Sequence, residues 1–421
     1  MDEEKRTEYD SQEDEELRRR MDKRKAERVE ERKIEQQKKA KKKEKARKYT
    51  LAAKIAFGVL VVLCLLFLAA QSLGNVTFSR ISDGIVQTFS NMKAGPGYPL
   101  TIGKNNCLRM DTFGDNLVLL EKDRVLLLNS TAKEIMSYKH TFSAPRLCVS
   151  NSRILLTDCK TGRYTVLSGR GMLTEGELKN EVYCSAIGNS GNYAFSQKSE
   201  VGASLVSFYF NDDSGEPFQF SCADEYIIGI SFSPNGKKAA LIGMGCKDAA
   251  DYSKLYIVSL TEQKVVKEFQ YDGIRLHTVF YSDNDTVITA FKNGYSIVKN
   301  NKERNDRLLD GSVIARFAVD YNGNWAFAVN GYGDEAGSTV CAFNSKGKEL
   351  CSTDLDVKVS GFDYKDGRIS VSASDGSLYC IRTSSGKCVK SGENCQSPDF
   401  VAVVKNKIYV SDNGELKRIS F

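Results

Sequence analysis

The chain has 421 residues, of which 41% are hydrophobic, and a formal net charge of +6 at pH 7. This length allows one large domain or two to three average ones. Residues 55–421 hold 40 basic and 39 acidic side chains, so they lack the basic excess that nucleic-acid binding requires, and we expect no nucleic-acid partner.

Residues 1–50 form a charged segment with 19 Lys or Arg against 15 Asp or Glu. Its few large apolar residues, such as Leu17 and Val29, do not keep a heptad, which argues against a coiled coil. Opposite charges three or four positions apart favour a solvated helix, and the acidic beginning is typical of disorder. We predict a cytoplasmic tail that is disordered or a single helix, and its role stays open.

Residues 51–73 form an apolar segment that only Lys54, Gln71 and Ser72 interrupt. At 1.5 Å per residue, a helix of this length spans about 34 Å, enough to cross the ~30 Å hydrocarbon core of a bilayer. Leu68 stands where a signal-peptide cleavage site needs a small residue, so cleavage is not expected. The sequence therefore predicts a single-pass transmembrane helix with the lipid bilayer as its partner.

The charges on either side of this helix predict its orientation in the cell membrane. Residues 38–48 hold eight Lys or Arg, whereas residues 74–84 hold only Arg80. Because the more basic flank stays in the cytoplasm, we expect the N-terminus inside and everything after residue 75 outside. Residues 74–97 contain enough Gly, Ser and Pro to act as a tether to a domain at 98–421.

Eight segments of residues 98–421 share one pattern, which the stretch GISFSPNGKKAALIG at residues 229–243 shows clearly. Apolar and polar residues alternate, a turn of Asn, Asp, Gly or Lys follows, and the alternation resumes. Period-two alternation is typical of a strand with one buried face, and these turn residues suit a hairpin. The eight turns are centred near residues 114, 151, 190, 236, 284, 323, 367 and 406.

A second hairpin follows most of these copies. The segments that we interpret in this way are residues 125–135, 154–167, 207–220, 255–269, 339–351 and 378–389. Two hairpins make a four-stranded sheet, which cannot bury both of its faces unless copies stack on one another. An all-β fold, an eight-bladed β-propeller, is therefore predicted, with seven blades as the alternative if the short second copy shares a blade.

The eighth copy supplies three strands and stops at Phe421. A ring left open there would expose a sheet edge, so a fourth strand must come from the other end of the domain. The stretch YPLTIG at residues 98–103 is the best candidate, and residues 85–89 are the second.

Two segments resemble known propellers: ISFSPNGKKAALI is similar to the inner hairpin of WD-repeat proteins, and LYCIRTSSGKCV to their outer hairpin. A charged tail, one anchor and GYPLTIG opening a propeller together resemble an uncharacterised family. Its members are single-pass, membrane-anchored extracytoplasmic β-propeller proteins of clostridia-like Gram-positive bacteria. The resemblance covers residues from about 100 to 421 and implies no activity.

The chain has 12 cysteines, eleven of them outside the apolar segment. Most lie in strands beside apolar residues, which is typical of buried thiols. Two disulfides, Cys341–Cys351 and Cys380–Cys388, are plausible because each pair brackets the turn of one outer hairpin. Since no CxxC occurs, a zinc site is disfavoured, and we expect neither a metal nor a cofactor.

The sequence contains no catalytic motif that we recognise. Neither of its two histidines, His140 and His277, lies beside a nucleophile signature, and GxSxG, HExxH and phosphate-loop motifs are absent. We therefore expect a binding protein and not an enzyme.

Loops usually carry function, and in propellers the loops between blades share one face with those joining second and third strands. Three loops of the second kind are long: residues 197–204, 244–254 and 330–338. They combine acidic residues with tyrosines, and the ligand-binding candidates are Asp248, Asp251, Tyr252, Tyr332, Asp334 and Glu335.

The function expected from these features is that of a membrane-tethered extracytoplasmic scaffold whose propeller face binds an envelope protein, a peptide or a cell-wall polymer. Two alternatives stay open. One is an envelope glycan hydrolase or lyase, which requires paired carboxylates near the central channel. The other is a sensor of an external ligand.

Overall fold

The computed structural model describes residues 94–421, apart from 212–215, 310–311, 332, 334–336, 397 and 406, together with Lys54, Phe57, Gly58 and Val61. The expected tail, most of the apolar segment and most of the tether lie outside these residues. Among the residues described, no helix is long and apolar enough to cross a membrane. The anchor and its orientation therefore stay predictions.

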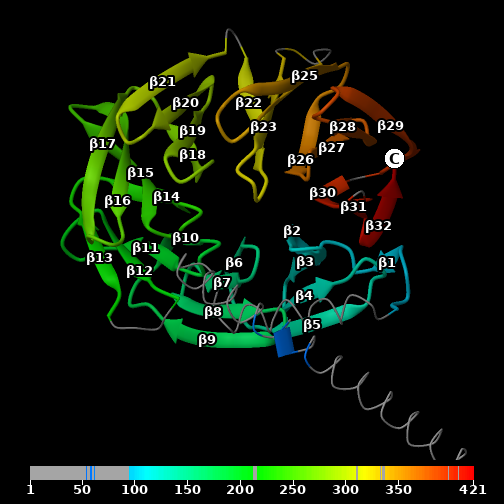
Figure 1. Cartoon of the computed structure of the whole chain (residues 1–421), viewed down its shortest axis with the longest axis horizontal. Coiled ribbons are helices and arrows are strands. Elements are labelled where there is room, and N and C mark those ends of the chain that lie inside the picture. Colours follow the sequence, from blue (N-terminus) through cyan, green and yellow to red (C-terminus); the bar gives the residue numbers. More distant parts are fainter. Residues whose placement is uncertain are drawn as a thin grey trace, which may run out of the picture. The chain divides into compact units, whose positions relative to one another are not determined.

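The 32 strands of the described part form eight antiparallel sheets of four strands each, arranged around a common axis (Figure 1). Each sheet is one blade, and the strands nearest the axis are β2, β6, β10, β14, β18, β22, β26 and β30. The strands of blades 1 and 2 are β2 (Cys107–Phe113), β3 (Asn116–Glu121), β4 (Arg124–Leu128), β5 (Glu134–Lys139), β6 (Pro145–Val149), β7 (Ile154–Asp158), β8 (Arg163–Ser168) and β9 (Gly171–Glu177). Those of blades 3 and 4 are β10 (Val182–Ile187), β11 (Tyr193–Lys198), β12 (Ser204–Tyr209), β13 (Phe218–Cys222), β14 (Tyr226–Phe232), β15 (Lys238–Lys247), β16 (Ala250–Ser259) and β17 (Lys264–Asp272).

The second half of the ring repeats this order. The strands of blades 5 and 6 are β18 (Leu276–Tyr281), β19 (Thr286–Phe291), β20 (Gly294–Lys299), β21 (Glu303–Leu308), β22 (Val313–Val319), β23 (Trp325–Asn330), β24 (Ser338–Phe343) and β25 (Glu349–Leu355). Those of blades 7 and 8 are β26 (Val359–Lys365), β27 (Arg368–Ala373), β28 (Ser377–Arg382), β29 (Lys387–Asn394), β30 (Pro398–Val404), β31 (Lys407–Asp412), β32 (Glu415–Ser420) and β1 (Leu100–Thr101). The prediction of eight blades is confirmed, and the alternative of seven is wrong.

The eight inner hairpins have their turns where the sequence predicts them, as the opening pattern at residues 229–243 illustrates. There β14 pairs with β15, so that Phe232 lies opposite Ala239. Gly236 in the turn has a φ of 70°, and a Cβ at this position would lie 2.4 Å from Cβ of Ser190 in the preceding blade. Only glycine fits, because the turn needs a positive φ and because the neighbouring turn approaches so closely.

The ring is closed by a strand from the beginning of the domain, as predicted. In the eighth blade, Leu100 of β1 pairs with Leu416 of β32, and Thr101 pairs with Glu415. The carbonyl oxygen of Gly414 also accepts hydrogen bonds from the two residues that follow β1, at 2.9 and 3.1 Å. The prediction that residues 98–103 supply the missing strand is therefore confirmed.

One predicted outer hairpin is wrong. Residues 154–167 form β7 and most of β8, the second and third strands of blade 2, whereas the outer hairpin of that blade joins β8 to β9. The inner strands β6 and β7 have only five residues each. The predicted outer hairpin therefore included β7, which already belongs to the inner hairpin of this blade.

The hydrophobic core consists of eight clusters, one in each seam between neighbouring blades. In the seam of blades 1 and 2, for example, Val118 and Leu120 pack against Ile154 and Leu156. A blade thus buries both faces only because it stacks on two neighbours, as expected for a repeat without a core of its own.

Side chains of the inner strands also bond to the backbone of the next blade. Nη1 of Arg146 in blade 2 donates to the carbonyl oxygen of Tyr183 in blade 3 at 2.8 Å. Nε of Arg316 in blade 6 donates to the carbonyl oxygen of Ser360 in blade 7 at 2.7 Å. These bonds link the inner edges of neighbouring blades around the channel.

Candidate binding face and seam cavity

The two faces of the ring differ in the connections that they carry. Because consecutive strands of a blade are antiparallel, the loops between blades and the loops joining second and third strands lie on one side, here called the inter-blade face. The turns of the inner hairpins lie on the other side, the hairpin face. The three long loops that the sequence singles out join the second and third strands of blades 3, 4 and 6, so all three lie on the inter-blade face, as expected.

The predicted loop at residues 244–254 is a ribbon made by the ends of β15 and β16, the longest strands of the described part. Its turn consists of Asp248 and Ala249, with φ angles of 52° and 61°. Asp248 is exposed at the tip of this ribbon. Three other candidates, Tyr332, Asp334 and Glu335, lie outside the described residues.

The remaining two candidates, Asp251 and Tyr252, bind other residues of the chain. Asp251 forms an ion pair with Arg275, whose Nε lies 2.9 Å from Oδ2 of the carboxylate. The hydroxyl group of Tyr252 donates to Oε1 of Glu225 at 2.8 Å. Of the candidates that the structure describes, only Asp248 is therefore exposed and unpaired.

Glu225, which sequence reasoning missed, is the centre of a buried polar network below this ribbon. Its side chain accepts hydrogen bonds from the thiol of Cys222 at 3.0 Å and the hydroxyl of Tyr256 at 2.8 Å. Nζ of Lys254 lies 2.7 Å from Oε1. Burial alone would raise the pKa of Glu225, but these bonds and that of Tyr252 outweigh it and lower the pKa to about 2. The ionised carboxylate thus fastens the ribbon to the loop between blades 3 and 4.

A cavity of about 750 Å³, here called the seam cavity, opens on the inter-blade face between the outer strands of blades 1 and 2. On the blade 2 side, Arg163 lies opposite Glu177 and Thr165 lies opposite Glu175 in the strand register. From blade 1, the hydroxyl of Tyr138 lies 3.2 Å from Oγ1 of Thr165. Charged, aromatic and hydroxyl groups therefore line one open space.

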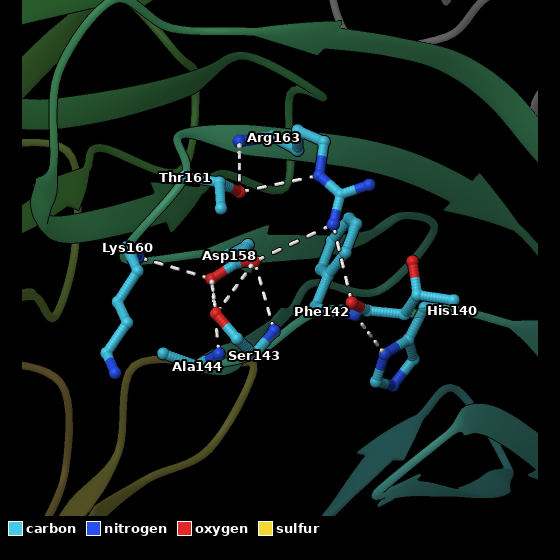
Figure 2. A network of polar contacts seen from close by, with 9 residues as sticks. His140, Phe142, Ser143, Ala144, Asp158, Lys160, Thr161 and Arg163 are labelled. Carbon is cyan, nitrogen blue, oxygen red and sulfur yellow. Dashed lines mark hydrogen bonds and ion pairs between the residues drawn. The ribbon is translucent and has the colours of Figure 1, made fainter.

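A network around Asp158 supports one wall of this cavity (Figure 2). The carboxylate is fully buried and accepts hydrogen bonds from the backbone N–H groups of Ser143, Ala144 and Lys160, at 3.0, 3.1 and 3.2 Å. Burial would raise the pKa of Asp158, but the hydrogen bonds that it accepts outweigh this effect and lower the pKa. Asp158 is thus an ionised anchor for the loop between blades 1 and 2.

Arg163 lies beside this anchor (Figure 2) and belongs to the lining of the cavity. Its Nη2 lies 3.9 Å from Oδ2 of Asp158, its Nε donates to Oγ1 of Thr161 at 3.4 Å, and its guanidinium carbon lies 5.2 Å from the ring centroid of Phe142. Such stacking on an aromatic ring restrains an arginine. The Arg163 side chain remains 42% exposed, so the charge is positioned and still accessible.

His140 fixes the same loop from the other side. Its Nδ1 accepts a hydrogen bond from the backbone N–H of Phe142 at 3.3 Å, and its Nε2 lies 3.2 Å from the carbonyl oxygen of Glu121. These partners assign a neutral ring with the proton on Nε2. Burial lowers the pKa of His140, which keeps the ring neutral.

The two plausible disulfides are not formed in the structure. In blade 6, Cys341 lies opposite Ser352 and not opposite Cys351. In blade 7, Cys380 lies opposite Val389, one position from Cys388. Neighbouring positions of a strand point to opposite faces, so the thiols of each pair are directed apart, and all four are free.

The part of the chain that the structure describes holds no group of three or more His, Cys, Asp or Glu side chains that could bind a metal ion. His277 lines the central channel, away from His140. The seam cavity on the inter-blade face combines a positioned guanidinium, two glutamates and aromatic side chains.

Solved structures of other proteins are similar to this chain. The computationally designed Ika8 protein has a TM-score of 0.56 at 10% identity, with 77% of this chain and 98% of that chain covered. BamB from Moraxella catarrhalis has a TM-score of 0.49 at 12% identity (76% and 98% covered), and the β-propeller domain of Cps50 (Swd1) from Myceliophteria thermophila has 0.46 at 10% (77% and 98% covered). At these identities the likeness shows the fold alone.

No curated protein matches the chain. The profile of one family, described as a family of unknown function and designated DUF5711, matches residues 86–421. This span includes all eight blades, and the chain therefore belongs to the DUF5711 family.

Proposed function

We propose that this chain is a membrane-tethered extracytoplasmic binding protein whose inter-blade face engages a protein, peptide or cell-wall ligand. The β-propeller fold is commonly an interaction scaffold. The observation that supports a ligand site is the seam cavity, where Arg163 is held by Asp158 and Phe142 and is still accessible. A pocket with a few convergent polar groups is the usual form of such a site.

The tethering follows from the apolar segment at residues 51–73 and its basic flank. Cys246 in the β15–β16 ribbon offers a direct test, because it is a free thiol and exposed. A membrane-impermeant maleimide added to intact cells is expected to label the wild-type chain. The Cys246→Ser variant should not be labelled. Labelling that requires prior lysis of the cells would refute the extracytoplasmic location.

Binding at the inter-blade face is tested by photo-crosslinking in whole cells. A benzophenone amino acid at Thr141, an exposed residue of the cavity lining, is expected to give adducts with an envelope component. The matched control places it at Lys237, an exposed residue of a hairpin-face turn in blade 4. Arg163→Gln should reduce the adducts at Thr141. Equal adducts at Thr141 and Lys237, or no effect of Arg163→Gln, would contradict the proposed site.

One observation favours the alternative of a glycan hydrolase or lyase. The pKa of Asp363 in β26 is raised to about 6, chiefly by burial and also by the charge of Asp111 in β2, which together outweigh the hydrogen bond that the carboxylate accepts from the backbone N–H of Val403. A carboxyl with a raised pKa beside a second carboxyl is the arrangement that glycosidases use. Release of soluble fragments from purified wall polymer by the wild-type chain, and not by Asp363→Asn, would establish this activity.

A further inference from the structure

A second cavity, of about 480 Å³, lies against the inner strands of five consecutive blades, β2, β6, β10, β14 and β18. It is separate from the seam cavity, whose lining comes from the outer strands of blades 1 and 2 and the loops beside them. Its lining combines charged, hydroxyl and apolar side chains, among them Arg109, Asp111, Arg146, Ser185, Ile230 and Val279.

The two arginines are each restrained by one contact and keep further donors free. Nη1 of Arg146 donates to the carbonyl oxygen of Tyr183, and its Nε and Nη2 have no partner among the described residues. Nη2 of Arg109 donates to Oδ2 of Asp111 at 3.3 Å, and its other nitrogens are likewise unpaired within the described chain. An arginine that is already positioned loses less conformational entropy when it binds a ligand.

The positive charges of both guanidinium groups lower the pKa of the same thiol, that of Cys148. This thiol donates to the carbonyl oxygen of Ser185 at 3.2 Å. Burial raises the pKa of Cys148, while the charges of Arg109 and Arg146 lower it without reversing the shift, so the thiol stays neutral. The lining contains two guanidinium groups, those of Arg109 and Arg146, and one carboxylate, that of Asp111. Its charged groups thus carry more positive than negative charge.

The opposite end of the channel is bridged by side chains. The hydroxyl of Tyr321, in a hairpin-face turn of blade 6, donates to the carbonyl oxygen of Thr112 in blade 1. Nζ of Lys365 in blade 7 donates to the carbonyl oxygen of Gly114 at 2.5 Å. Arg109 and Arg146 lie near the beginnings of β2 and β6, at the inter-blade end, so a ligand reaches them from that face.

We propose that this channel cavity binds an oxyanion, a carboxylate or phosphate group, that is attached to an apolar body. The oxyanion lies between Arg109 and Arg146, because guanidinium groups pair with such anions through two parallel hydrogen bonds. The apolar body packs against Ile228, Ile230 and Val279, which belong to the same lining. Neither residue set overlaps with the seam cavity, so this site stands independently of the proposed function.

The test is equilibrium binding to the full chain in detergent, measured by isothermal titration calorimetry. The probes are N-acetyl-leucine, its uncharged amide, and inorganic phosphate. The carboxylate is expected to bind at least about tenfold more tightly than the amide, since charge-assisted hydrogen bonds are among the stronger ones. Binding of phosphate but not of N-acetyl-leucine would support the site and assign the phosphate source. Equal binding of the acid and the amide, or no binding of any probe, would overturn the proposal.

A matched arginine supplies the control. The double variant Arg109→Gln, Arg146→Gln is expected to lose the preference for the carboxylate. Arg316→Gln removes the same kind of inter-blade hydrogen bond, to the carbonyl oxygen of Ser360, but Arg316 lies outside the cavity lining, so this variant should bind as the wild type does. If the double variant fails to fold, Arg109→Gln alone serves, because Arg109 bonds only within its own strand. An unchanged preference in that variant would overturn the proposal.

Discussion

The seam of blades 5 and 6 and the seam of blades 1 and 2 are built from the same order of strands. The first is filled by aromatic side chains, whereas the second contains a cavity. In the first, the indole of Trp325 is fully buried and stacks on Phe343, with ring centroids 4.2 Å apart, and on Phe317 at 5.8 Å. Tyr295 of blade 5 meets the indole edge-on at 5.2 Å. Aromatic side chains thus fill this seam.

The seam of blades 1 and 2 has a core of mainly aliphatic side chains, with Phe113 and Met136 among them, and polar groups on its outer strands. Its cluster contains leucine, isoleucine and valine side chains, whereas the outer strands carry Arg163, Thr165 and Glu175 beside the cavity. The backbone arrangement is therefore the same in both seams. The side chains of the outer strands determine whether a seam is filled or contains a cavity. This comparison makes four predictions.

The largest effect is expected when the aromatic seam is opened. Trp325→Ala should reduce the free energy of unfolding by about 3–5 kcal/mol, because it removes a large buried side chain and leaves a cavity. Chemical denaturation of the full chain measures this loss. Trp325→Phe is the control and should lose much less, since Nε1 of Trp325 has no hydrogen-bond partner among the described residues. Equal losses in the two variants would show that the seam does not depend on packing volume.

The polar network of Glu225, between blades 3 and 4, tests how much a buried charge adds to a seam that is already packed with apolar side chains. The pKa of Glu225 is lowered from 4.5 to about 2 in the folded chain. A lowered pKa stabilises the fold fully above pH 4.5, and this contribution is lost as the pH falls toward 2. At neutral pH this contribution is on the order of 3 kcal/mol.

The wild type should therefore lose its advantage in free energy of unfolding over Glu225→Gln as the pH falls from 4.5 to 2. Chemical denaturation at a series of pH values measures both. The Tyr252→Phe variant lacks one of the hydrogen bonds to Glu225. Its stability should therefore depend less on pH than that of the wild type over the same range. A difference that does not change with pH would contradict the ionised state of Glu225.

The fold could be predicted because its turns and strands have local sequence patterns. Gly236 in its turn and the strand at residues 98–103 were both predictable, one from the positive φ of a hairpin turn and the other from the need to cover a sheet edge. The hairpin at residues 154–167 was misassigned because two five-residue strands gave too short a pattern to fix the register.

The site was less predictable, because its parts meet only when blades stack. Arg163 and Phe142 come from different elements, and their contact depends on the loop that Asp158 holds. Tyr252 looked like an exposed loop residue, yet it lies on an extended strand and points toward Glu225. Spacing along the chain does not tell which side of such a ribbon faces the protein.

A smaller loss is expected at the wall of the open seam. Asp158→Asn should cost about 1–2 kcal/mol, because a neutral amide is a weaker acceptor for the backbone N–H groups of Ser143 and Ala144. Chemical denaturation measures this loss, and hydrogen exchange should show faster exchange at these two amides. Protection that is unchanged there would mean that the loop is held without the carboxylate.

The smallest effect on stability is expected at Arg163, although it is the residue closest to the proposed ligand. Its side chain is 42% exposed and lies 3.9 Å from Asp158, so Arg163→Gln should cost no more than about 1 kcal/mol. The crosslinking yield at Thr141 should nevertheless fall. A loss of stability as large as that of Trp325→Ala would mean that Arg163 packs the seam as the indole does. The cavity would then be a packing gap and not a ligand site, and the contrast between the two seams would disappear.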